Sequence, residues 1–163
     1  MALKSDRHEL DTDISFFMNE VATRGGIASI STVGSGAAMD QGAALVTYDA
    51  TPSGAVPAGL LLNDMVNLDL TRQHINWHKD EIQKGGKVTL LRKGWVVTDM
   101  IEGTAPTAGQ PVFVAHSGNV SASDIVGNGT MPAIGTFLST VDQDGYAKVS
   151  ISLPVTWKLS ADA

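Results

Sequence analysis

The chain has 163 residues, which fits one domain with an arm or tail, and 43% of them are hydrophobic, enough for a buried core. Its formal net charge of −6 argues against direct nucleic-acid binding, which needs a basic face. Cysteine is absent, so disulfides and thiol chemistry are excluded. No apolar run approaches the ~20 residues that span a bilayer, and the N-terminus is too charged for a signal peptide. We therefore expect a soluble protein without a membrane partner.

Residues 1–26 differ from the rest and are predicted to form an N-terminal arm or short helix. Their first half is rich in charge, and apolar residues then recur at helical spacing at Leu10, Ile14, Phe17 and Val21. As a helix, the segment would pack on its own domain. As an extended arm, it would dock its Phe16-Phe17-Met18 patch on another subunit. The sequence leaves both interpretations open.

The chain from residue 27 to 155 is predicted to form a β-rich domain, beginning with short strands at 27–33 and 43–48. A further strand is expected in the second half of 58–70, where Val66, Leu68 and Leu70 alternate with polar residues. Residues 71–82 form either a helix capped by Thr71 or a polar excursion between strands.

Residues 85–101 are predicted to be the central strand of this domain. β-Branched and aromatic residues dominate the segment, which suits a pleated, packed surface. Val88 and Leu90 would point to one side, and Leu91, Trp95 and Val97 to the other. A strand that is apolar on both sides is covered on both sides. Gly94 would mark a bulge or bend in it.

Three further strands are predicted after the central strand, at 112–115, 134–141 and 146–153. The last has the clearest alternation, with Ala147, Val149, Ile151 and Leu153 on one face. Residues 116–132 are expected to be a long polar loop, 142–145 a hairpin turn, and 156–163 a C-terminal tail. Many short strands separated by turns predict an all-β fold, a small barrel or sandwich.

No pattern in the sequence carries a catalytic, cofactor or metal site above background. His74 and His78 have the spacing of two ligands on one helical face, but Ile75 stands where a zinc hydrolase needs glutamate. The segment from Asp142 to Gly145 lacks the terminal ligands of a calcium loop and is better explained as a hairpin turn. We therefore expect a protein that is not an enzyme and needs no cofactor.

Several segments, taken together, resemble the head decoration or cement proteins of tailed bacteriophages. They are AGLLLND at 58–64, TRQHIN at 71–76, GGKVTLLRKGW at 85–95, PTAGQP at 106–111, IGTFL at 134–138 and DQDGYAKV at 142–149. The resemblance spans about residues 37–154. It implies a small β-rich domain on the outer surface of the mature capsid, commonly a trimer, which bridges neighbouring major capsid protein subunits and stabilises the shell.

Large apolar residues in otherwise polar segments are the expected contacts with these partners. They are Phe16, Phe17 and Met18 as anchors on the capsid, with Ile14 as a further interface residue, and Trp77 or Trp157 in a subunit interface. Two alternatives remain. One is another virion module, such as a fibre, a spike or a carbohydrate-binding domain. The other is an enzyme that uses a metal at His74 and His78.

Overall fold

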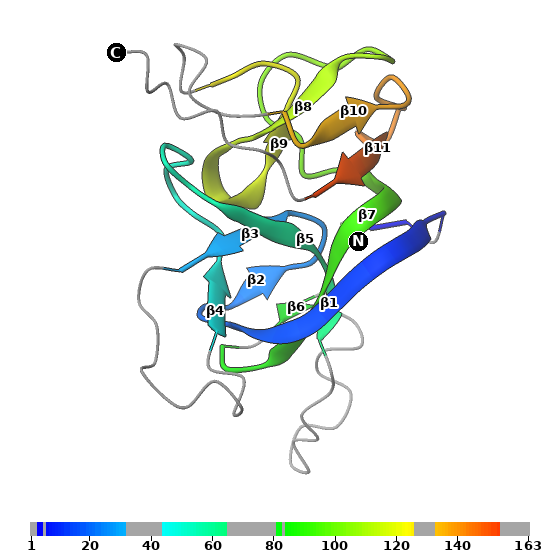
Figure 1. Ribbon diagram of the computed structural model, residues 1–163. Helices are drawn as coiled ribbons and strands as arrows, with labels where there is room; N and C mark the ends of the chain where they lie inside the picture. The colour runs from blue at the N-terminus through cyan, green and yellow to red at the C-terminus, as the bar shows by residue number, and fades with distance from the viewer. Residues whose placement is uncertain are drawn as a thin grey trace.

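The computed structural model describes residues 3–4, 6–31, 44–64, 81–82, 84–125 and 133–153, and almost all of its regular structure is β. Figure 1 shows these elements. They are β1 (His8–Met18), β2 (Ala22–Thr23), β3 (Ile27–Ile30), β4 (Ala44–Thr47), β5 (Pro57–Asp64), β6 (Glu81–Ile82), β7 (Lys87–Thr98), β8 (Pro111–Val114), the 3-10 turn η3 (His116–Gly118), β9 (Val120–Ser121), β10 (Gly135–Phe137) and β11 (Ala147–Ser152). The predicted all-β fold is confirmed. In this part of the chain, no helix could span a membrane.

Five strands are hydrogen-bonded in a closed ring, in the order β1, β4, β3, β5, β7 and back to β1. The β1–β4 pair is parallel, and the other pairs are antiparallel. β2 and β6 form a separate two-stranded sheet. In Figure 1 the ring occupies the lower half of the molecule.

β7 connects the ring to a second group of strands. Along one edge it pairs first with β5, through residues 88–91, and then with β11, through residues 93–98. β10, β8 and β9 continue from β11, above the ring in Figure 1. β1 follows the opposite edge of β7 through residues 87–95. Two differently placed strands therefore share one edge of β7, and β1 covers the other edge.

The hydrophobic core has two parts, which lie on opposite sides of β7. Val88 and Leu90 belong to a cluster with Met18, Val46 and other ring residues. Leu91 and Val96 belong to a cluster with side chains from the second group of strands, such as Phe137. Burial on both faces is therefore confirmed up to Leu91. Beyond Gly94, Val96 is buried in place of the predicted Trp95 and Val97, which are half-buried and belong to neither cluster.

At Gly94, β1 lies against the backbone of β7 with no room for a side chain. The glycine's φ of 142° is a conformation that side chains rarely adopt, and a Cβ built there would lie 2.0 Å from the His8 carbonyl oxygen. The β1–β7 register shifts on either side of Asp11, while the β7–β11 register runs through Gly94 without interruption. The predicted irregularity thus belongs to the pairing with β1.

Most predicted strands are confirmed, although all but β8, which is shifted by one residue, are shorter than predicted. They are β3, β4, β7, β8, β10 and β11, and the predicted turn at 142–145 joins the last two. In β11 the residues predicted to be buried, Ala147, Val149 and Ile151, are buried, as is Leu153 directly after it. Burial of one face is what produces the period of two in this segment.

The described residues decide between two alternatives, add a strand that is not predicted and correct one prediction. The N-terminal segment is a strand from His8 to Met18 rather than a helix, because pairing with β7 satisfies its backbone groups. The first part of residues 58–70, for which no strand is predicted, lies within β5, because this apolar run is buried on both sides. The predicted loop at 116–132 contains η3 and β9. The expected strand at 66–70 and the helix alternative at 71–80 lie outside the described residues.

Candidate functional site

β1 is anchored in its own domain at both ends. Ahead of the strand, Leu3 is buried in the core and forms a β-bridge with Thr98, and the Lys4 N–H donates to the Val97 carbonyl at 3.0 Å. At the other end, Met18 has no exposed surface. The predicted extended arm is therefore a fixed strand of the domain over the described residues. Residues 1–26 as a separate unit remain a prediction.

The turn at 142–145 strengthens the first of these anchors. The Lys4 Nζ forms an ion pair with Asp142 Oδ2 at 3.1 Å and lies 4.5 Å from the centre of the Tyr146 ring. Hydrogen bonds donated by the Tyr146 N–H and by Lys4 lower the pKa of Asp142, and the bond to Asp142 raises the pKa of Lys4. The carboxylate therefore connects the N-terminus to the β10–β11 hairpin.

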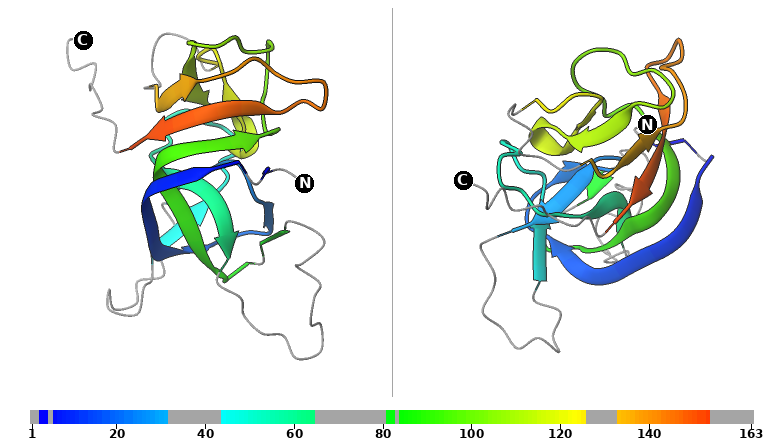
Figure 2. Two further views of the ribbon diagram at one scale, coloured as in Figure 1. Left: turned by 90° about the vertical axis from the view of Figure 1, so that its right-hand side faces the viewer. Right: turned by 45° about the horizontal axis from the view of Figure 1, so that its top comes forward.

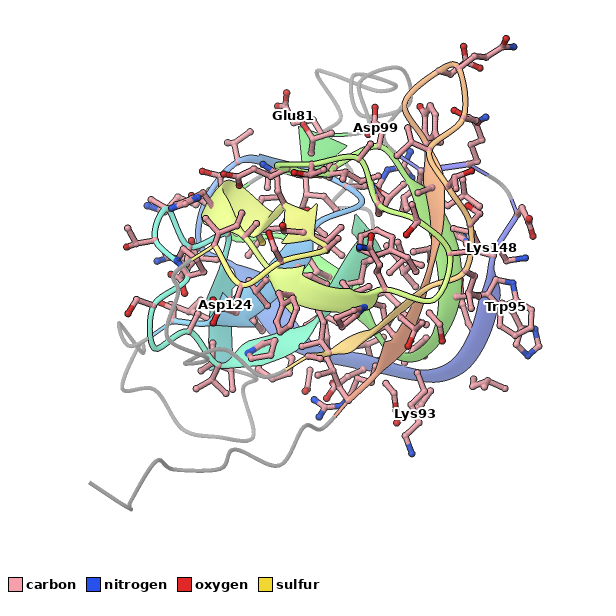
Figure 3. The ribbon with its side chains drawn as sticks, turned by 90° about the horizontal axis from the view of Figure 1, so that it is seen from above. Glu81, Lys93, Trp95, Asp99, Asp124 and Lys148 are labelled. Atoms are coloured by element: carbon pink, nitrogen blue, oxygen red, sulfur yellow. The ribbon has the colours of Figure 1, made fainter. Side chains whose placement is uncertain are left out.

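Trp95 of β7 contacts the beginning of β1. The His8 ring stacks on the Trp95 ring at 4.5 Å between centroids, and the Lys148 Nζ lies 5.2 Å from the same ring. Lys148 also forms an ion pair with Asp6 at 3.6 Å. Figure 3 shows Trp95 and Lys148 near each other beside the β1 ribbon. These contacts hold residues 6–8 against the sheet.

Between its anchors, β1 is exposed on both faces. Leu10 is 68% exposed and Ile14 is 48% exposed, and both belong to the small set of large apolar side chains that solvent reaches. Glu9 and Asp11 are exposed as well. Burial alone would raise the pKa of Asp13, but hydrogen bonds from the Ser15 hydroxyl and N–H outweigh it and lower that pKa. The strand thus presents apolar side chains among carboxylates.

The structure separates the predicted interface residues. Ile14 is exposed, and Phe16 and Phe17 are half-buried, with Phe16 packed against the core inside the ring. Met18 lies fully inside that core, which is not the position of an exposed anchor. It is buried because β1 ends by pairing with β4 inside the ring. Trp77 and Trp157 lie outside the described residues.

Leu10 is an exposed apolar residue that the sequence interpretation misses. Helical spacing places it on a buried face with Ile14 and Phe17, whereas the strand exposes it. The polar and charged residues that surround it from His8 to Asp13 are the available signal, because such residues are mostly exposed.

In the described residues, histidine, carboxylate and tyrosine side chains hold turns and strands together. They contain no group of three side chains that could hold a metal, and His74 and His78 lie outside them. Glu102 accepts hydrogen bonds from the His116 N–H and contacts His116 Nδ1 at 2.9 Å, which fixes the turn η3. Tyr48 donates to the Thr23 carbonyl and accepts from the Gly26 N–H, so it joins β4 to the β2–β3 turn.

Comparison with known proteins identifies a family and similar solved structures. No curated protein sequence matches the chain. Among solved structures, the N-terminal base of head fibre gp8.5 of bacteriophage phi29 is similar, with a TM-score of 0.52 and 10% identity. That match covers 90% of this chain and 94% of the fibre-base chain, and at this identity it shows a shared fold.

The family is described as structural cement protein (E217 gp24/Pam3 gp6), and its sequence model matches residues 11–152. This range spans most of the chain, from β1 to the end of β11. The expected resemblance to cement proteins is confirmed, and it places the protein with the capsid of a virion. The chain belongs to the phage structural cement proteins.

Proposed function

We propose that the chain binds the outer surface of a mature phage head as a homotrimer and stabilises the shell by bridging major capsid protein subunits. The match of residues 11–152 to the cement family carries this proposal. We propose a structural role without catalysis, cofactor or direct contact with DNA. The net charge of −6 supports the last point, because like charges repel.

The physical requirement is tight binding from contacts that are individually weak. Burying one leucine, isoleucine or phenylalanine side chain contributes about 1.5–3 kcal/mol. Three copies of such a contact on one rigid body act together, and their effective concentration raises the overall affinity. The contacts proposed on the capsid are Ile14, Phe16 and Phe17, and Trp77 and Trp157 are proposed for a subunit interface.

Binding of purified protein to heads assembled without it tests this function. The wild-type protein should bind these heads and should reduce their loss of DNA on heating. Phe17→Ala should weaken binding and leave the unfolding temperature nearly unchanged, since Phe17 is only half-buried. Val56→Ala is a matched control, because Val56 is 44% exposed and lies before β5, outside β1.

Two outcomes of this experiment would count against the proposal. Failure of the wild-type protein to bind would reject the capsid-binding function. If Phe17→Ala unfolded the protein instead, Phe17 would be a core residue, and the contact would have to be reassigned to Ile14. Native mass spectrometry of the free protein tests the trimer, with an expected mass of three times 17.0 kDa.

The base of a fibre is the second candidate, favoured by the similarity to the head fibre base of phi29. Electron microscopy of heads with and without the chain distinguishes the two, because only a fibre base would remove projecting fibres when it is missing. A carbohydrate-binding role finds less support. His8 and Lys148 already lie over Trp95, where a sugar ring would stack.

A further inference from the structure

One edge of β1 has no strand partner among the residues that the structure describes. β1 pairs with β7 through His8–Phe17, but with β4 only through Phe16–Met18. From His8 to Asp13, the second edge of the strand is therefore unpaired within the described ranges. Figure 2 shows β1, in blue, at the outside of the sheet beyond β7. We call residues 8–13 on this side the β1 edge.

An unpaired strand edge is a template for another strand, so proteins usually protect it. The β1 edge has two of the usual protections, since its register against β7 is irregular and it carries charged side chains. All of its full charges are negative, because β1 contains Glu9, Asp11 and Asp13 and no lysine or arginine. Pairing of two β1 edges would bring like charges together, which is destabilising. A second copy of this chain is therefore a poor occupant.

The need to protect the edge from pairing does not explain why apolar side chains are exposed on it. Leu10 is 68% exposed on the β1 edge, and Ile14 follows just beyond it. Asp11 is in register with Lys93 but forms no ion pair with any described residue. An exposed leucine beside a carboxylate that forms no ion pair among the described residues fits a partner that supplies both an apolar contact and a positive charge.

We propose that the β1 edge binds an extended, basic segment of the shell protein as an additional strand. Backbone hydrogen bonds to residues 8–13 would give affinity, as in other cases of strand addition. Leu10 would contact an apolar residue of that segment, and Asp11 a lysine or arginine. This inference rests on the proposed capsid-binding function and adds the chemistry of the partner.

The test combines a charge reversal with hydrogen exchange, using heads assembled without this chain as the probe. Asp11→Lys should weaken binding of the full chain to these heads by about tenfold or more at low salt. Asp99→Lys makes the same change at an exposed aspartate beyond the end of β7, and it should bind like the wild type. Within residues 8–13, the amide protons that point away from β7 should exchange about tenfold or more slowly in the bound protein than in the free protein.

Four outcomes would overturn the strand addition or the function on which it rests. Equal binding of all three proteins, or unchanged exchange at residues 8–13, would overturn the strand addition while wild-type binding still supports the capsid function. Protection in the free protein of the amides that point away from β7 would mean that this chain or a second copy covers the edge, which also overturns it. Failure of the wild type to bind would instead reject the proposed function on which the inference rests.

Discussion

At the residue scale, Gly94 shows how one position links sequence to the exposed strand. Its backbone conformation and its approach to His8 leave no room for a side chain. The sequence predicts an irregularity there because glycine interrupts an otherwise apolar strand. It does not identify the cause, since His8 lies far away in the chain and only the fold brings it near.

Gly94→Ala should destabilise the protein by about 3–5 kcal/mol, because it adds both backbone strain and a collision with β1. Gly85→Ala is the matched control. Its φ is 83° and a Cβ there meets nothing within 4 Å, so only the left-handed strain of about 1–2 kcal/mol is expected. Urea unfolding measures both values. Equal destabilisation by the two substitutions would contradict the close approach of β1 and β7.

At the element scale, local patterns predict strands that are buried on a regular face. β7 and β11 are recognised by their apolar residues because the core covers them. β1 is mistaken for a possible helix because Leu10, Ile14 and Phe17 happen to recur at helical spacing. A strand that is exposed on both faces has no burial pattern to reveal it. Its pairing with β7 depends on residues about 80 positions away.

The same limit applies to the candidate interface. Ile14 is exposed as an anchor requires, but Met18 is buried, because the pairing with β4 carries the end of β1 into the ring. Apolar composition alone cannot separate an anchor from a core residue, since both are large hydrophobic side chains. The exposed Leu10 is recognised only when the strand is seen.

The contact between the N-terminus and the β10–β11 hairpin should make stability depend on pH. The pKa of folded Asp142 is lowered, so its contribution is present above the ordinary aspartate pKa and is lost as the pH falls through the folded value. Asp142→Ala should therefore lower the unfolding temperature at pH 7, and the difference should vanish in acid.

Thermal unfolding across this pH range, followed by circular dichroism, measures the effect. Asp144→Ala is the control, because Asp144 lies in the same exposed turn and its side chain forms none of these bonds. A difference between wild type and Asp142→Ala that stays constant down to acidic pH would show that the carboxylate charge is not responsible.

At the scale of the whole molecule, the closed ring cannot be read from local sequence. It depends on five pairings, among them the parallel pair of β1 and β4 and the long antiparallel pair of β1 and β7. These contacts pair an exposed, acidic strand into a closed ring of strands. A strand whose backbone is already ordered is suited to binding a surface, because little conformational entropy is lost on binding.

The copy number of the chain in purified virions tests the central claim most directly. Quantitative mass spectrometry would compare it with the major capsid protein. If the chain covers the shell lattice as a cement protein, we expect about one copy per major capsid protein, or a ratio that the symmetry of the lattice fixes. A few copies per particle would place the chain at a vertex, a tail or a sparse fibre, and its absence from the particle would contradict a capsid-stabilising role.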